Sequence, residues 1–175
     1  MALAAGRASL WETLAREAAD ESPLWSSALR PAHEREETPV FSLLAADPFA
    51  LGLETIYEGY LLHYGRPRLF ETSDRDTAVL LGDYLYAHGL VHVAELGDVD
   101  VVADLAELIS VCAHLRVEGR PGDGAAWASA VALLGRWRHA FDVSGDAAAW
   151  VELAEAGAPA EAVAHSLTLH AERVS

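Results

Sequence analysis

Signals that start and stop α-helices recur along the chain, and they constrain its fold more than any other feature of the sequence. Ser9 and Glu12 stand in the spacing of a capping box, and Asp47-Pro48, Asp74 and Asp98 place capping residues before further apolar-periodic stretches. In these stretches apolar residues return every three or four positions, and no stretch shows the period-two alternation of a half-buried strand. The sequence therefore predicts an all-α protein.

Glycine and proline residues end most of these stretches and so divide the chain into separate helices. We expect a single bundle of about seven to eight helices in one domain, residues 1–175. Between the first two helices, residues 21–38 are expected to form an irregular or mobile segment. The expected helices begin near residues 9, 39, 48, 74, 98, 125, 147 and 159, and the sixth is expected to run from 125 to 141.

Charge and composition exclude several classes of function. The chain carries 27 acidic and 12 basic side chains, a formal net charge of −15, so it repels nucleic-acid backbones and anionic lipid surfaces. The sequence contains no lysine, which excludes phosphate-loop and Schiff-base lysines. No apolar run approaches the roughly 20 residues of a membrane span. The single Cys112 is expected to be buried and inert, which favours a cytoplasmic protein.

Four short motifs follow one another in the middle of the chain: Gly65-Arg66-Pro67, the heptapeptide from Val79 to Leu85, Leu96-Gly97-Asp98 and Glu118-Gly119. In their order and spacing they resemble the trans-polyprenyl diphosphate synthases, over roughly residues 54–119. The resemblance implies part of the isoprenoid-synthase fold. It also implies that the helix containing Gly82 and Asp83 packs closely through its glycine, lies at the cavity and takes part in subunit association.

The same comparison indicates that catalysis has been lost. Active family members bind Mg²⁺ and an allylic diphosphate through two aspartate-rich motifs, whereas this chain has Glu54, Thr55 and Glu58 at the first one. Residues 63–64 replace a pair of basic residues, and residues 140–146 lack the paired aspartates of the second motif. The resemblance therefore predicts no catalytic residues and a relic metal and diphosphate region. That region comprises Glu54, Glu58, Arg66, Arg68 and Asp83.

Simpler interpretations of these residues compete with the relic site. Glu54 and Glu58, at i and i+4, are expected on a solvated helix face, because exposed glutamate is the usual case. Arg66 and Arg68 are able to clamp a phosphate, but in an acidic chain surface pairing with carboxylates is favoured. For Asp83 a structural use is favoured over catalysis.

Two further patterns that contain histidine have the spacing of functional sites. His88 and His92 lie one helical turn apart with Glu95 after them, so this trio is a candidate metal site. We favour histidines at the core edge that share hydrogen bonds. Ser166 and His170 have the spacing of a nucleophile and its base, but nothing in the sequence supplies an oxyanion donor.

Three functions remain open and are ranked here. The first is a non-catalytic accessory subunit in polyprenyl diphosphate biosynthesis, either a homodimer or a hetero-oligomer with a catalytic prenyl synthase. The second is a helical adaptor or ligand-binding bundle unrelated to isoprenoids. The third is a reduced Mg²⁺-dependent prenyltransferase, and only this one needs a cofactor.

Overall fold

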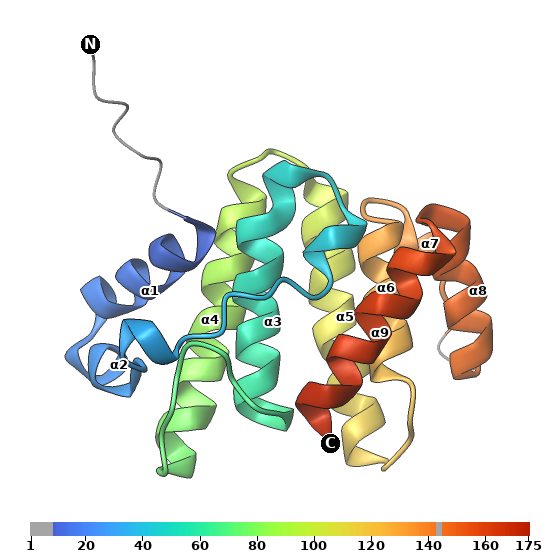
Figure 1. Cartoon of the computed structure of the whole chain (residues 1–175). Coiled ribbons are helices and arrows are strands. Elements are labelled where there is room, and N and C mark those ends of the chain that lie inside the picture. Colours follow the sequence, from blue (N-terminus) through green and yellow to red (C-terminus); the bar gives the residue numbers. More distant parts are fainter. Residues whose placement is uncertain (1–8, 143–144) are drawn as a thin grey trace.

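The computed structural model describes residues 9–142 and 145–175, and in them it is all-α. Two long helices lie side by side in the middle of the molecule, with a helical pair at one end and five helices at the other (Figure 1). In the described residues no helix is both long and apolar enough to cross a membrane. The elements, in which η marks a short 3-10 helix, are α1 (Leu10–Glu21), α2 (Pro23–Ala28), η1 (Ala32–Glu34), η2 (Ser42–Leu44), η3 (Asp47–Phe49), α3 (Ala50–Tyr64), α4 (Arg75–Ala94), α5 (Val99–Val117), α6 (Asp123–Ala132), α7 (Trp137–Ala140), α8 (Ala147–Gly157) and α9 (Ala160–Val174).

The predicted N-caps form as the sequence indicates. Ser9 and Glu12 make the reciprocal hydrogen bonds of a capping box at α1. Asp74 accepts a hydrogen bond from the Thr77 amide at α4, and Asp98 does the same for Val101 at α5. Each cap satisfies an amide that the first helical turn leaves unpaired.

Two predicted helix boundaries are wrong, and one predicted irregular segment is only partly irregular. Residues 21–38 contain α2 and η1, whereas residues 30–31 and 35–38 have no regular structure. The chain after α2 makes hydrogen bonds from Arg30 N to Leu69 O and from Glu36 N to Arg68 O. No helix begins at Pro39, because residues 35–40 continue as irregular chain. The helix expected over 125–141 ends at Ala132.

The break after α6 has a clear physical reason. Gly135 has a φ of +82°, a conformation that other residues rarely adopt and that no α-helix contains. Beyond it, the buried carboxylate of Asp104 accepts hydrogen bonds from the Trp137 and Arg138 amides at 3.0 and 3.1 Å. These two bonds fix the start of α7 against α5.

Two pairs of glycines set the distance between α3 and α4. A β-carbon at Gly59 would lie 2.8 Å from Gly82 O, and one at Gly89 would lie 2.8 Å from Gly52 O. Both pairs are seven residues apart on each helix, so the two backbones approach at two successive points of an antiparallel contact. The close packing expected for Gly82 is thereby confirmed.

The core has two parts on either side of the α3–α4 pair. The larger part lies between α3, α5, α6, α8 and α9, and it includes Tyr57, Trp127 and Trp137. The smaller part contains Trp11 and Leu14 of α1 together with Leu81 and Leu85 of α4. Because α3 is covered on both sides, every residue from Gly52 to Leu61 is buried.

Candidate functional site

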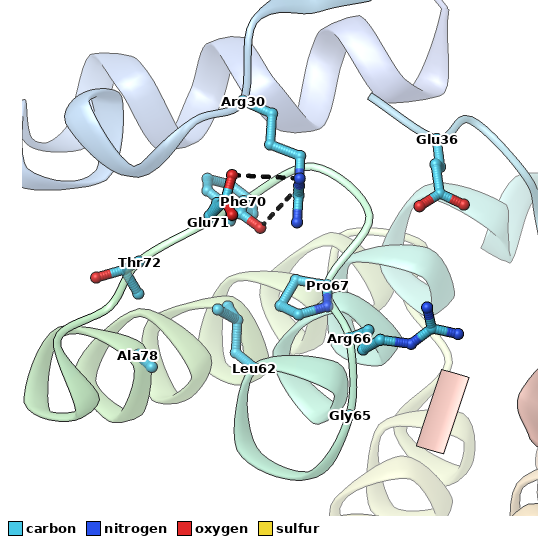
Figure 2. A pocket seen from close by; sticks show the side chains of 10 residues that line it. All are labelled: Arg30, Glu36, Leu62, Gly65, Arg66, Pro67, Phe70, Glu71, Thr72 and Ala78. Carbon is cyan, nitrogen blue, oxygen red and sulfur yellow. Dashed lines mark hydrogen bonds and ion pairs between the residues drawn. The ribbon is translucent and has the colours of Figure 1, made fainter. Parts of the chain in front are cut away.

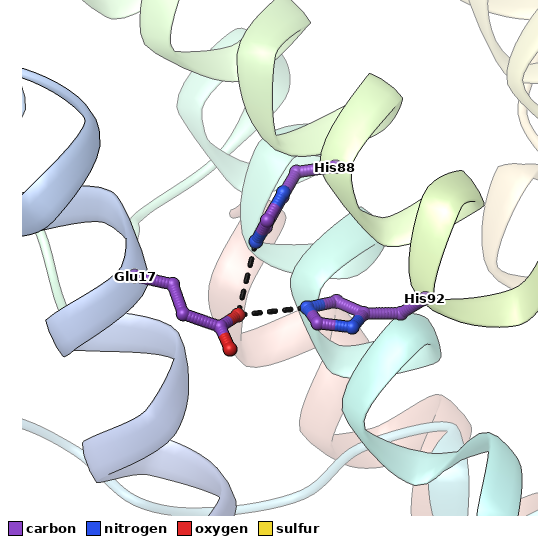
Figure 3. A group of neighbouring side chains, drawn as sticks. All are labelled: Glu17, His88 and His92. Carbon is purple, nitrogen blue, oxygen red and sulfur yellow. Dashed lines mark hydrogen bonds and ion pairs between the residues drawn. The ribbon is translucent and has the colours of Figure 1, made fainter. Parts of the chain in front are cut away.

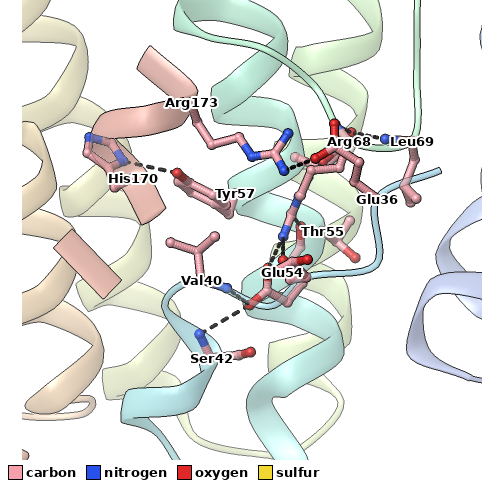
Figure 4. Close-up of polar contacts among 12 residues, drawn as sticks. Glu36, Val40, Ser42, Glu54, Thr55, Tyr57, Arg68, Leu69, His170 and Arg173 are labelled. Atoms are coloured by element: carbon pink, nitrogen blue, oxygen red, sulfur yellow. Dashed lines mark hydrogen bonds and ion pairs between the residues drawn. The ribbon is translucent and has the colours of Figure 1, made fainter. Parts of the chain in front are cut away.

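Three of the five residues of the predicted relic region form a fully buried ion-pair cluster. Glu54 and Glu58 point from successive turns of α3 toward Arg68, and all three side chains are excluded from solvent. Arg68 Nη1 donates to Glu54 Oε2 at 2.6 Å, and Arg68 Nε donates to Glu58 Oε2 at 2.9 Å. Figure 4 shows the guanidinium of Arg68 lying against Glu54 and the chain near Val40. One guanidinium therefore bridges both carboxylates.

Backbone amides complete the coordination of the two carboxylates. Glu54 Oε1 accepts from the amides of Val40 and Ser42 at 3.1 and 3.2 Å. Glu58 Oε1 accepts from the amides of Arg68 and Leu69 at 2.7 and 2.8 Å. Two negative charges face one positive charge here, so these four amide dipoles supply the remaining compensation that burial of a charge requires. The cluster thereby ties residues 38–42 and 68–69 to α3.

Arg68 is held equally firmly. It also donates to Thr38 O at 2.9 Å and to Glu54 O at 3.2 Å, and its guanidinium lies 4.8 Å from the ring centre of Trp11. Burial alone would lower the pKa of Arg68, but the charges of Glu54 and Glu58 outweigh it and raise that pKa. The guanidinium is therefore permanently charged.

Both sequence expectations for Glu54 and Glu58 are corrected by this geometry. Neither residue lies on a solvated helix face, because both are completely buried. Neither is free to bind a metal, because every carboxylate oxygen already accepts a hydrogen bond from a protein donor. Thr55, between them on the same helix, donates its hydroxyl to Leu51 O within α3.

Arg66 and Arg68 do not form a clamp. Arg68 is inside the protein, whereas Arg66 is exposed and donates to Glu172 O of α9. Arg66 lines an open pocket of about 480 Å³, which also contains Arg30, Glu36 and Glu71 (Figure 2). Arg30 is paired with Glu71 at 3.3 Å. The surface pairing with carboxylates expected for Arg68 is wrong, because Arg68 pairs with carboxylates inside the protein. The pocket has no concentrated positive charge for a diphosphate.

Asp83 is exposed on α4, and its Oδ1 lies 3.1 Å from Nε2 of His63. A β-carbon at Gly82 would lie 2.6 Å from the same His63 nitrogen, so the missing side chain at Gly82 makes room for this ring. Burial lowers the pKa of His63, although the charge of Asp83 acts in the opposite direction. Among the described residues, no hydrogen bond or ion pair joins Asp83 to Glu54 or Glu58.

A second, partly buried polar network was not predicted from the sequence. The carboxylate of Asp123, at the start of α6, accepts hydrogen bonds from the Tyr60 hydroxyl and from Arg116, and it lies 3.7 Å from Nε2 of His170. Burial opposes ionisation of Asp123, yet the nearby imidazole of His170, the hydrogen bond from Tyr60 and the charge of Arg116 lower its pKa. The network joins α3, α5, α6 and α9. Its members are too far apart in the sequence for any spacing rule to connect them.

Ser166 and His170 do not act together. Ser166 donates its hydroxyl to Val40 O at 2.7 Å, while Nδ1 of His170 lies 3.0 Å from the Tyr57 hydroxyl. Cys112 is buried, as expected, and burial raises the pKa of its thiol. Ser166 and Cys112 are both buried, so neither exposes a nucleophilic atom to solvent.

His88 and His92 do share a carboxylate, but it is not the predicted one. Their Nε2 atoms lie 2.9 and 2.8 Å from the same oxygen of Glu17, which comes from α1 (Figure 3). The predicted Glu95 is more distant, 4.0 Å from Nδ1 of His92. The sequence gives no sign of Glu17, because its partners are 71 and 75 positions away.

Comparison with known proteins adds no relative to this description: no protein-family model, no curated protein and no solved structure matches the chain.

Proposed function

We propose that this chain is a non-catalytic, polyprenyl-synthetase-like subunit that binds a catalytic prenyl synthase through the outer face of α4. We define this outer face by Leu80, Ala87 and Val91, which lie along one side of the helix away from α3. Leu80 is 57 % exposed and Val91 is 52 % exposed. This exposed aliphatic face is the observation that carries the proposal.

The physical argument rests on how apolar helices are normally buried. Each exposed aliphatic side chain of a helix leaves favourable burial unused. The inner face of α4 is buried against α3 through Gly82, Leu85 and Gly89. A partner on the outer face would bury the remaining aliphatic surface. In the trans-polyprenyl diphosphate synthases that the sequence resembles, the helix that corresponds to α4 takes part in subunit association.

The non-catalytic part is supported by the buried cluster. The carboxylates that align with the family's first aspartate-rich motif are Glu54 and Glu58, and both pair with Arg68 inside the protein. Transfer of a prenyl group needs carboxylates that hold Mg²⁺ around a diphosphate in an accessible cavity. In this chain the same positions stabilise the fold.

A binding experiment with matched variants tests the proposal. The chain is mixed with the full-length polyprenyl diphosphate synthase encoded in the same genome, and the complex is measured by size-exclusion chromatography with light scattering. We expect a hetero-oligomer that Leu80→Asp or Val91→Asp abolishes. Val117→Asp is the control, because Val117 is 88 % exposed at the end of α5, away from the outer face. If the chain forms no complex with the synthase, the proposal is refuted.

The same samples separate the other two functions. Mg²⁺-dependent turnover of an allylic diphosphate with isopentenyl diphosphate by the isolated chain would favour a reduced prenyltransferase. A complex with an unrelated protein that Leu80→Asp disrupts would favour the helical adaptor, because the outer face would then serve a different partner.

A further inference from the structure

We infer that Glu17, His88 and His92 form a binding site for a transition-metal ion of the Zn²⁺ class, which joins α1 to α4. Three ligand atoms, one from each residue, all lie within 4.8 Å of one another. They come from two separate helices, and Figure 3 shows the side chains converging from opposite sides on one point. The inference is independent of the proposed function, because these residues are not on the outer face of α4.

The spacing on α4 presents both imidazoles to the same point. His88 and His92 are one turn apart, so their rings project from the same side of the helix. The ring of His88 stacks on that of Tyr84 at 5.3 Å, and the ring of His92 meets that of His88 edge-on at 4.6 Å. These contacts hold the rings with both Nε2 atoms toward Glu17.

The distances suit a metal after a small adjustment. Zn²⁺ binds imidazole nitrogen and carboxylate oxygen at about 2.0–2.2 Å in tetrahedral geometry, which separates ligand atoms by about 3.3 Å. The two Nε2 atoms now lie 2.9 and 2.8 Å from Glu17 Oε2. A movement of the glutamate oxygen by about half an ångström, within its rotamer freedom, therefore brings its distance to each nitrogen to that value. The three ligand atoms already lie within 4.8 Å of one another, so closing around an ion needs only side-chain adjustment.

Charged side chains lie around the three ligands. A metal-bound Nε2 requires its ring proton on Nδ1, and in His92 that atom lies 4.0 Å from Oε2 of Glu95, beyond direct hydrogen-bond distance. The second oxygen of Glu17 lies 3.7 Å from Arg16, so the oxygen that faces the histidines is the one left for the ion.

The donor set selects the class of ion and its coordination. Two imidazoles and one carboxylate favour Zn²⁺, Co²⁺ or Ni²⁺ over Mg²⁺ and Ca²⁺, which prefer oxygen ligands alone. The three side chains are only partly buried, so water can take the fourth position. Because α1 contributes one ligand and α4 two, binding would fasten the N-terminal helix to the central pair.

Metal titration of the tag-free full-length chain tests the inference. Zn²⁺ is added in a non-chelating buffer and followed by calorimetry, and Co²⁺ is followed by its visible absorption. We expect one ion per chain with saturation in the micromolar range and the strong visible bands of tetrahedral Co²⁺. His92→Ala should weaken binding at least about 100-fold, more than the loss of an outer hydrogen-bond partner usually does.

Two further variants make the result decisive. Glu17→Gln keeps the shape and a hydrogen-bond acceptor but removes the charge, and we expect about 10-fold or greater loss of affinity with unchanged circular dichroism. His114→Ala is the control, because His114 is an exposed histidine on α5 whose Nε2 lies 3.3 Å from Oε2 of Glu118, and it belongs to neither helix of the site.

Hydrogen exchange reports the connection between the helices. Zn²⁺ should slow amide exchange in α1 of the wild-type chain but not in Glu17→Gln. Absence of saturable binding in the wild type would overturn the inference. So would equal affinities of Glu17→Gln and His114→Ala, which would indicate a two-histidine surface chelate that does not involve α1.

Discussion

Replacement of Arg68 by methionine isolates the electrostatic part of the buried cluster. Methionine retains much of the apolar volume that packs near Trp11 and Tyr57, whose ring centres lie 4.8 and 5.1 Å from the guanidinium. It removes the positive charge that faces Glu54 and Glu58 at 2.6 and 2.9 Å. The variant therefore leaves two carboxylates buried without a counter-charge.

The expected loss of stability is large. Removal of one partner from a buried ion pair typically costs about 3–5 kcal/mol, because the remaining charge stays desolvated. Arg68 serves two carboxylates and also satisfies the carbonyls of Thr38 and Glu54, so the upper end of that range is expected. A domain has about 5–15 kcal/mol in total, so Arg68→Met would remove a third of it or more.

Urea unfolding at neutral pH measures the difference, with the m-value checked for constancy. The matched control is the triple variant Glu54→Gln, Glu58→Gln and Arg68→Met, which removes all three charges and keeps oxygen acceptors for the backbone amides. Because neutral replacement of a whole buried cluster is often tolerated, the triple variant should recover most of the loss. If Arg68→Met costs less than about 1 kcal/mol, or the triple variant is no more stable than it, the charge argument fails.

Three other positions give sharp predictions. Gly59→Ala places a methyl group 2.8 Å from Gly82 O. The cost of overpacking, about 1–3 kcal/mol, should outweigh the gain of about 1 kcal/mol in helix propensity, so the midpoint of urea unfolding should fall. A higher midpoint would contradict the close helix contact. The pKa of Asp123 is lowered in the folded state, so its contribution to the free energy of unfolding is present above the ordinary aspartate pKa of 3.8 and is lost as the pH falls further. Stability measured between pH 5 and about 3 should therefore decline, and Asp123→Asn should flatten that decline. Asp104→Asn replaces one carboxylate oxygen that accepts from the α7 amides by an NH2 donor. It should lower the free energy of unfolding by about 1–3 kcal/mol and speed hydrogen exchange at the Trp137 amide. Unchanged exchange there would show that α7 does not depend on this carboxylate.

The parts of the fold that could be predicted are those that depend on neighbouring residues. The caps at Ser9, Asp74 and Asp98 each bond to an amide three positions away, so the sequence contains the whole interaction. The break after α6 also has a local sign in Gly135, but glycine alone does not reveal its φ of +82°. Its cause includes Asp104, more than 30 positions earlier.

The environment of Glu54 and Glu58 could not be read from their i, i+4 spacing, because their partner Arg68 lies in a loop 14 and 10 positions away. One signal in the sequence did point to burial. The segment from Leu51 to Leu62 has apolar residues on every side of the helix, so no face of it is suited to water. A carboxylate inside such a helix must have a buried partner, and this reasoning leads to an ion pair instead of a solvated face.

The same reasoning applied to α4 explains why its sequence lacks a clear polar face. One side, with Gly82 and Gly89, packs against the backbone of α3. A second side, with His88 and His92, faces Glu17 of α1. The third side is the outer face. Three different demands on one helix leave little room for the charged residues that mark a surface helix. Because the metal ligands and the outer face are on different sides, Zn²⁺ should leave the affinity for a partner unchanged, whereas Leu80→Asp should abolish partner binding without affecting Zn²⁺ affinity.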